Sequence, residues 1–188
     1  MRVAVIGCGD IAQVMHIPYL IELPDIDVHA VVDATPSRAA GVAEQYNIPH
    51  HHTDAETLLA ERASELDGVV IATPVDQHAK PAITALEAGL SAFIEKPLAV
   101  SITEAEAILT AAEESRGVAM VGYNKRYDAS FIRFQKEIAA MESEDLVSVY
   151  DVDPDHWRIF HEVYDTVGEP VSDDLRARSE RLQQTAAK

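Results

Sequence analysis

The chain has 188 residues, 47% hydrophobic and 25% charged, which is typical of a globular protein with one complete core. Its 32 acidic and 15 basic residues give a net charge of −17. Such a charge disfavours nucleic acid and anionic membrane surfaces as partners, because both repel it, and favours a small-molecule ligand. No apolar run approaches the roughly 20 residues that cross a bilayer, so we expect no membrane association.

The start of the chain and its single cysteine both favour the cytoplasm. Met1 leads into an apolar run too short for a signal peptide, and Cys8 alone cannot form an internal disulfide. Only five of the 15 basic residues are lysines. An acid-rich, lysine-poor surface is typical of proteins that stay soluble in high salt, so a halophilic source is one hypothesis and an acidic mesophilic protein the other.

Apolar runs of strand length alternate with helical patterns over the first two thirds of the chain. This alternation predicts an α/β fold, a doubly wound parallel sheet of the Rossmann type covered by helices. The predicted strands are Val3–Ile6, Val28–Val32, a short one near His52, Gly68–Ala72, Ala92–Glu95, Val118–Gly122 and Leu146–Val152. The predicted helices are Ile11–Glu22, Ser37–Tyr46, Ala55–Arg62, His78–Ala88, Ile102–Ser115 and Ser130–Met141, with Ser101 and Glu104 forming a capping box.

The first strand runs through GCGDIA, residues 7–12, directly into a helix, which is the context that a dinucleotide-binding fingerprint requires. Gly7 allows the tight turn, Gly9 lets a pyrophosphate approach the backbone, and Ala12 lets the helix pack closely on the strand. The N–H groups and positive end of the helix attract phosphates. We therefore predict that Gly7, Gly9, Asp10, Ile11 and Ala12 bind a cofactor; the alternative is a simple turn.

Asp33 ends the second predicted strand, 21 residues after Ala12, close to the spacing of about 20 at which an acid holds the ribose hydroxyls. An ionised Asp33 repels a 2′-phosphate and therefore favours NAD. The residues that follow at once could bind a 2′-phosphate: Thr35, Ser37 and Arg38. NADP therefore stays an alternative cofactor, and NAD is preferred by a small margin. The alternative for Asp33 is a turn residue at the end of a strand.

Three adjacent histidines, His50, His51 and His52, suggest a metal site, but neighbouring residues on a strand or helix cannot all face one ion. We therefore predict no metal site. Cys8 lies by a helix N-terminus that is expected to lower its pKa, yet no partner histidine is identifiable, which argues against a catalytic thiol.

Residues 68–105 closely resemble the central stretch of the Gfo/Idh/MocA family, which includes glucose-fructose oxidoreductase and inositol dehydrogenases. The resemblance covers about residues 1–150. The pieces that carry it are the glycine loop, ATP (72–74), His78, AG (88–89), EKPL (95–98) and GYNKRYD (122–128).

The resemblance implies that the N-terminal domain binds NAD or NADP and that Lys96 is catalytic, positioning cofactor and substrate. Lys96 ends a strand, where open parallel sheets place ligands. It could hydrogen-bond a substrate hydroxyl and, if buried, serve in proton transfer. Glu95 is its expected neighbour and a cofactor-binding residue, and the bond from Lys96 to Pro97 is expected to be cis.

The resemblance also places Thr73 and Pro74 beside the nicotinamide and His78 near the cofactor. A structural histidine at the start of a helix is an equally good interpretation of His78. Arg126 and Tyr127 reach the substrate in one interpretation and serve packing in the other.

The chain departs from the family after residue 128, where full members continue into a C-terminal domain with a large open antiparallel sheet. That domain supplies an aspartate and a histidine in a glycine-rich context. Residues 1–123 are therefore expected to form the dinucleotide-binding domain and residues 124–188 a truncated remnant, with one strand and a late amphipathic helix. Because this strand lacks its sheet, we expect a homo-oligomer or a partner subunit to cover it.

These features favour an enzyme, an NAD(P)-dependent oxidoreductase. It would transfer hydride between nicotinamide and a hydroxyl carbon of a sugar, cyclitol or similar polyol. The alternatives are a noncatalytic NAD(P)-binding module and a truncated subunit whose partner supplies the missing half.

Overall fold

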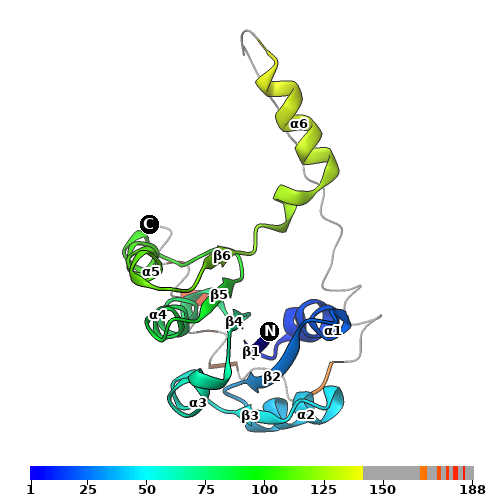
Figure 1. Ribbon diagram of the computed structural model, residues 1–188, viewed down its shortest axis with the longest axis vertical. Helices are drawn as coiled ribbons and strands as arrows, with labels where there is room; N and C mark the ends of the chain where they lie inside the picture. The colour runs from blue at the N-terminus through cyan, green and yellow to red at the C-terminus, as the bar shows by residue number, and fades with distance from the viewer. Residues whose placement is uncertain (142–165, 169–172, 175–176, 178–179, 182–183, 185–188) are drawn as a thin grey trace. The chain divides into compact units, whose positions relative to one another are not determined.

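A computed structural model of the protein describes residues 1–141, 166–168, 173–174, 177, 180–181 and 184 (Figure 1). Its contacts divide the chain into two compact units, one of residues 1–122 and 166–188 and one of residues 123–165. The stretch 124–188, expected to be one remnant, thus contributes to both units. The predicted strand Leu146–Val152 and most of the late helix lie outside the described residues.

A six-stranded parallel sheet forms the first unit, in the order β3-β2-β1-β4-β5-β6. The strands are β1 (Arg2–Ile6), β2 (Asp27–Val32), β3 (His50–His52), β4 (Gly68–Ile71), β5 (Ser91–Ile94) and β6 (Ala119–Val121). This sheet confirms the predicted Rossmann-type fold. The strand order reverses beside β1, and ligands bind at the carboxyl ends of the strands at such a point.

Each predicted helix falls within two residues of its expected ends. In the first unit the helices are η1 (Ala12–His16, a π-helix), α1 (Ile17–Glu22), α2 (Pro36–Tyr46), α3 (Ala55–Arg62), η2 (Ala63–Glu65), η3 (Val75–Gln77), α4 (Ala79–Glu87) and α5 (Ile102–Glu114). The short helices η2 and η3 were not predicted. The predicted cap is confirmed in part, because the Ser101 hydroxyl accepts from the Glu104 N–H at 3.2 Å. The Glu104 carboxylate accepts from that hydroxyl at 3.1 Å, whereas in a capping box it accepts from the Ser101 N–H.

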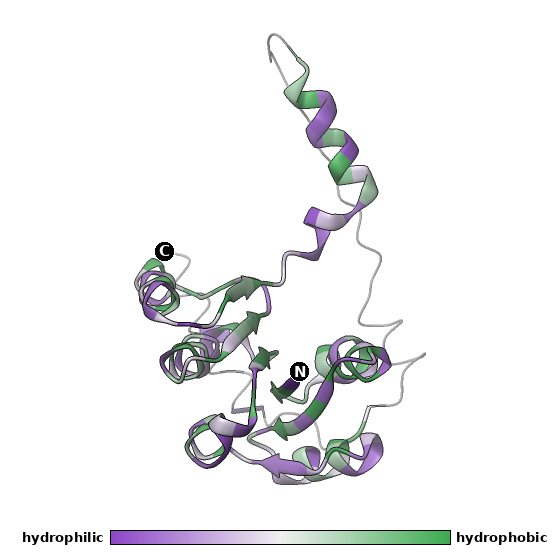
Figure 2. Cartoon of the chain, viewed as in Figure 1, coloured by the Kyte–Doolittle hydropathy of each residue, from purple (hydrophilic) through white to green (hydrophobic). Residues whose placement is uncertain are grey.

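Two apolar cores hold the helices on opposite faces of the sheet. Leu58, Leu86 and Ile108 bring α3, α4 and α5 onto one face, whereas Ile17 and Val42 bring α1 and α2 onto the other. Full burial of each such aliphatic side chain contributes about 1.5–3 kcal/mol. Hydrophobic residues accordingly run along the central strands, and hydrophilic residues gather on helix faces (Figure 2).

Strand β2 carries an irregularity in its pairing with β1. Val3 pairs with Val28 and Ala4 with Ala30, so His29 is an extra residue without a partner on β1. Such a β-bulge re-aims the side chain of the inserted residue.

The described part of the second unit contains η4 (Asn124–Tyr127) and α6 (Ala129–Ala139). Asp128 caps α6 by accepting from the N–H and hydroxyl of Ser130. In the described part of the chain, no helix is both long and apolar enough to cross a membrane.

Candidate functional site

The two glycines of the first loop serve different purposes. Gly7 has a φ of 95°, and a side chain there would come within 2.7 Å of the backbone of Ala72 and Thr73. Gly9, in contrast, has no atom of a described residue beyond its chain neighbours within 4 Å of the place where a Cβ would lie. Gly7 therefore lets β1 and β4 end close together, and Gly9 leaves open space against the loop backbone.

The helix after the loop begins as the sequence predicted. The Gln13 N–H donates to the Gly9 carbonyl at 3.1 Å, and Ala12 is fully buried under the turn. Asp10 is half-buried and Ile11 is exposed. The first N–H groups of a helix have no intrahelical acceptor, which gives this end its affinity for anions.

Asp33 ties the glycine loop to the end of β2. Its Oδ2 accepts from the Cys8 N–H at 3.0 Å, and its Oδ1 accepts from the Thr35 N–H at 2.8 Å. Arg38 approaches the same Oδ1 at 3.4 Å, and both side chains are largely buried. These bonds agree with the alternative interpretation, a turn residue at the end of a strand, and the charge of Asp33 also faces an arginine; its role in cofactor binding stays a prediction.

A cleft of about 610 Å³ opens at the carboxyl ends of β1, β2 and β4. Its size falls within the usual range of small-molecule sites. Five of the predicted site residues line it: Gly7, Asp33, Arg38, Thr73 and Pro74. The other predicted site residues are not part of its wall: Gly9, Asp10, Ile11, Ala12, His78, Glu95 and Lys96.

His78 is buried between two loops. Its Nε2 lies 2.9 Å from the Thr73 carbonyl oxygen, and its Nδ1 lies 3.0 Å from that of Pro97. A neutral imidazole has one N–H, so it donates to one of these carbonyls at a time. The ring links the loop after β4 to the loop after β5, which supports the structural interpretation.

Glu95 contacts a residue that sequence reasoning missed. Its Oε1 lies 2.9 Å from His16 Nε2, and its Oε2 accepts from the Lys96 N–H at 2.9 Å. Burial raises the pKa of Glu95, but the hydrogen bonds from His16 and the Lys96 N–H outweigh it, and the pKa is lowered overall. His16 also packs edge-on against Phe93.

The Lys96–Pro97 bond is cis, as expected. Lys96 itself is exposed, so the burial that would suit it to proton transfer is absent. The strand β5 ends at Ile94, two residues before Lys96.

The expectation that the helix N-terminus lowers the pKa of Cys8 was wrong. Burial, with the negative charge of Asp33 beside it, raises the pKa of Cys8 to about 12. The sulfur faces the Val32 carbonyl oxygen at 3.5 Å, within the core beneath the helix. Desolvation therefore outweighs the helix dipole at this position.

Gln13 is a second residue that sequence reasoning missed. Its amide nitrogen donates to the Cys8 carbonyl at 2.8 Å and to the Val167 carbonyl at 3.1 Å, and its Oε1 accepts from the Val167 N–H at 2.7 Å. In the sequence, a glutamine on an otherwise apolar helix does not indicate a hydrogen-bond partner more than 150 residues away. The bonds attach the chain near Val167 to the glycine loop.

Arg126 and Tyr127 are exposed residues of the second unit. They precede α6, and both interpretations of their role, contact with the substrate and packing, stay open.

Comparisons with known proteins agree with this geometry. Residues 1–123 match the Gfo/Idh/MocA family, described as an oxidoreductase family with an NAD-binding Rossmann fold. Inositol 2-dehydrogenase from Rhizobium meliloti is 31% identical over 82% of this chain and 46% of its own length. A 4-carboxy-2-hydroxymuconate-6-semialdehyde dehydrogenase from Sphingobium is 32% identical over 76% of this chain and 44% of its own length.

Among solved structures, an oxidoreductase from Agrobacterium radiobacter in complex with NAD⁺, L-tartaric acid and magnesium is similar. It is 28% identical with a TM-score of 0.65, over 74% of this chain and 40% of that one. The chain thus spans less than half the length of these proteins.

Proposed function

Because this chain belongs to the Gfo/Idh/MocA oxidoreductase family, we propose that it is the NAD(P)-binding part of an enzyme that oxidises or reduces a polyol. The reaction would transfer hydride between nicotinamide and a hydroxyl carbon of a sugar, cyclitol or similar compound. The observation that carries the proposal is the cleft at the reversal of strand order, which brings Gly7, Asp33 and Thr73 together.

The residues fit a dinucleotide on two grounds. Among the described residues, none beyond the chain neighbours of Gly9 comes within 4 Å of the place where a Cβ would lie, which favours access of a pyrophosphate to the loop backbone. The Asp33 carboxylate lies on the wall of the cleft, where it could accept from ribose hydroxyls. The cofactor, when bound, supplies the hydride chemistry.

Within this proposal NAD is preferred over NADP by a small margin. The negative charge of Asp33 opposes a 2′-phosphate, and Arg38 at 3.4 Å offsets part of that charge. Cofactor preference therefore depends on the balance of these two side chains.

Lys96 is the proposed catalytic residue. The Lys96 N–H donates to the Glu95 carboxylate, which also forms a hydrogen bond with the His16 ring. The backbone that carries the lysine is therefore anchored to the helix after the glycine loop. The exposed ammonium group is free to donate a hydrogen bond to a substrate hydroxyl. Glu95 and His16 would then act as positioning residues.

A second proposal is a noncatalytic module, or a subunit that acts only with a partner. It is favoured by one observation, that the chain spans less than half the length of its relatives. In that case the chain binds the nucleotide but turns over no polyol by itself.

Two measurements test these proposals. NADH fluorescence titration is expected to show binding for the wild-type chain, and an absence of binding to NADH and NADPH would overturn both proposals. A polyol dehydrogenase screen then separates enzyme from module. Lys96→Ala is expected to remove turnover and leave NADH affinity unchanged, with Lys136→Ala on α6 as the control. Full turnover in the Lys96 variant would contradict the assigned role.

A further inference from the structure

Two histidines are brought to one face of the sheet by the pairing of β2 with its neighbours. The core residues Ala30 and Val32 of β2 face the α3 side. His29 is the extra residue of the bulge, and its ring lies near that of His50, with centroids 4.8 Å apart. His50 pairs with Ala30 on β3, so it shares this face.

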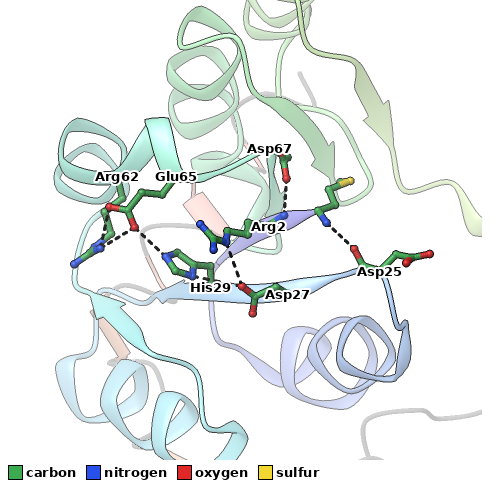
Figure 3. Close-up of polar contacts among 8 residues, drawn as sticks. Arg2, Asp25, Asp27, His29, Arg62, Glu65 and Asp67 are labelled. Carbon is green, nitrogen blue, oxygen red and sulfur yellow. Dashed lines mark hydrogen bonds and ion pairs between the residues drawn. The ribbon is translucent and has the colours of Figure 1, made fainter.

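Glu65 joins the two histidines from a separate element, η2. Its Oε2 lies 3.0 Å from His29 Nε2. One ligand atom from each of His29, His50 and Glu65 lies within 4.8 Å of the others, and all three residues are half-buried. Figure 3 shows the His29 ring between the carboxylates of Glu65 and Asp27.

We propose that His29, His50 and Glu65 form a binding site for a divalent transition-metal ion, with Zn²⁺ as the representative ion. Two imidazoles and one carboxylate are a ligand set that suits zinc, and three protein ligands leave a fourth position for water. Zinc bonds of about 2.0–2.2 Å place tetrahedral ligand atoms roughly 3.4 Å apart. The His29–Glu65 pair, at 3.0 Å, is already near that spacing, and the ligand atom of His50 lies within 4.8 Å of both, so metal binding requires it to move closer.

Charged neighbours act on the site in opposite directions. Asp27 Oδ2 lies 3.6 Å from His29 Nδ1, where its charge favours a proton on that nitrogen once a metal occupies Nε2. Glu65 Oε2, 3.0 Å from Nε2, favours a proton on Nε2 in the absence of a metal, so the ion must displace that proton. Arg62 Nη1 lies 3.0 Å and 3.2 Å from the two Glu65 oxygens. Metal binding therefore requires Glu65 to turn Oε2 from Arg62 to the ion, and the arginine competes with the metal.

The proposed site is separate from the cofactor cleft. None of its three ligands lines that cleft, and His50 begins β3, whereas the cleft opens where the strands end. The proposal therefore does not depend on the proposed enzyme function.

The test is calorimetric titration of Zn²⁺ into the full chain after EDTA treatment and desalting, with excess Mg²⁺ to occupy surface carboxylates. We expect one equivalent to bind. His50→Ala and Glu65→Gln are each expected to weaken Zn²⁺ binding about tenfold or more, and Asp27→Asn less. His51→Ala is the matched control, because His51 is on the same strand, faces the other side and is exposed.

Three results would overturn the proposal: wild-type affinity in the His50 variant, equal loss in the His51 variant, or displacement of Zn²⁺ by Mg²⁺. If the His50 variant does not fold, Co²⁺ bound to the wild-type chain gives a second readout. A visible absorption spectrum typical of Co²⁺ with few ligands, among them nitrogen atoms, supports the site. A spectrum identical to that of Co²⁺ in water contradicts it. NADH titration, run in parallel, reports on the cofactor site independently.

Discussion

His16 Nε2 lies 2.9 Å from Glu95 Oε1, which joins the helix after the glycine loop to the end of β5. These elements are far apart in the sequence, and the pair fixes the backbone that presents Lys96. The contact is largely buried, with about one sixth of each side chain exposed, so it is shielded from solvent more than a surface pair.

Replacing Glu95 with glutamine is expected to lower stability by about 1–3 kcal/mol at neutral pH, because a charged hydrogen bond is lost. The pKa of Glu95 is lowered in the folded state, so its stabilisation is present above the unfolded value of about 4.3 and is lost as the pH falls through the lower folded value. Urea unfolding of both proteins at pH 7 and below pH 4 measures this. The exposed Glu113→Gln is the control, and a difference that stays constant with pH would contradict the assignment.

Asp33 and Arg38 are expected to set cofactor preference in opposite directions. Asp33→Asn removes the charge that repels a 2′-phosphate and should shift the ratio of NADPH to NADH affinity upward, by about tenfold, or about 1.4 kcal/mol. Arg38→Ala should shift it downward. Fluorescence titration with both nucleotides gives the ratio, and Arg116→Ala serves as a control on a distant helix end. Movement of both variants in the same direction would refute this division of roles.

The two loop glycines are expected to respond differently to alanine. Gly7→Ala forces a side chain against the Ala72 and Thr73 backbone at positive φ and should cost roughly 1–3 kcal/mol of stability or more. Gly9→Ala meets no protein atom, so it should fold normally and weaken NADH binding. Thermal melts and NADH titration of both variants check this. Unchanged NADH affinity in a folded Gly9 variant would argue against pyrophosphate at this loop.

Cys8 is expected to react slowly with thiol reagents at pH 8, because its pKa of about 12 leaves almost no thiolate. In urea the reaction should become fast. Between pH 9 and about 12 the folded state keeps a proton that the unfolded state loses, so stability should fall as pH rises. Cys8→Ala is expected to show a shallower decline over this range, the rest coming from groups such as Tyr46, whose pKa burial also raises. Rapid labelling of the native protein would contradict the buried state.

Salt is expected to stabilise the chain if its charge of −17 reflects a halophilic source. Screening by KCl weakens repulsion among the carboxylates, which should raise the melting temperature. A melting temperature that is flat or falls with KCl leaves the acidic mesophilic alternative.

Local sequence patterns determined the fold of the first unit almost completely. Unbroken apolar runs, the cap signal at Ser101 and the glycine loop are carried by a few neighbouring residues, so the strands and the longer helices could be placed within two residues, whereas the short η2 and η3 were missed. The family motifs around Lys96 are equally local. Gly7, Asp33 and the pair Thr73 and Pro74 follow three strands, β1, β2 and β4, and parallel strands bring their carboxyl ends to one edge, which made their meeting predictable.

Tertiary structure alone decided the contacts between elements and the burial of single groups. His16 meets Glu95, and Gln13 meets Val167, across separations at which no periodicity operates. Desolvation reversed the expected pKa shift of Cys8, and a one-residue bulge, invisible in the pattern of β2, set His29 beside His50. Sequence patterns determine which helices and strands form, because these patterns act over one or two turns. The burial of a side chain and the register of a strand depend on the residues that the completed sheet and helices place around it.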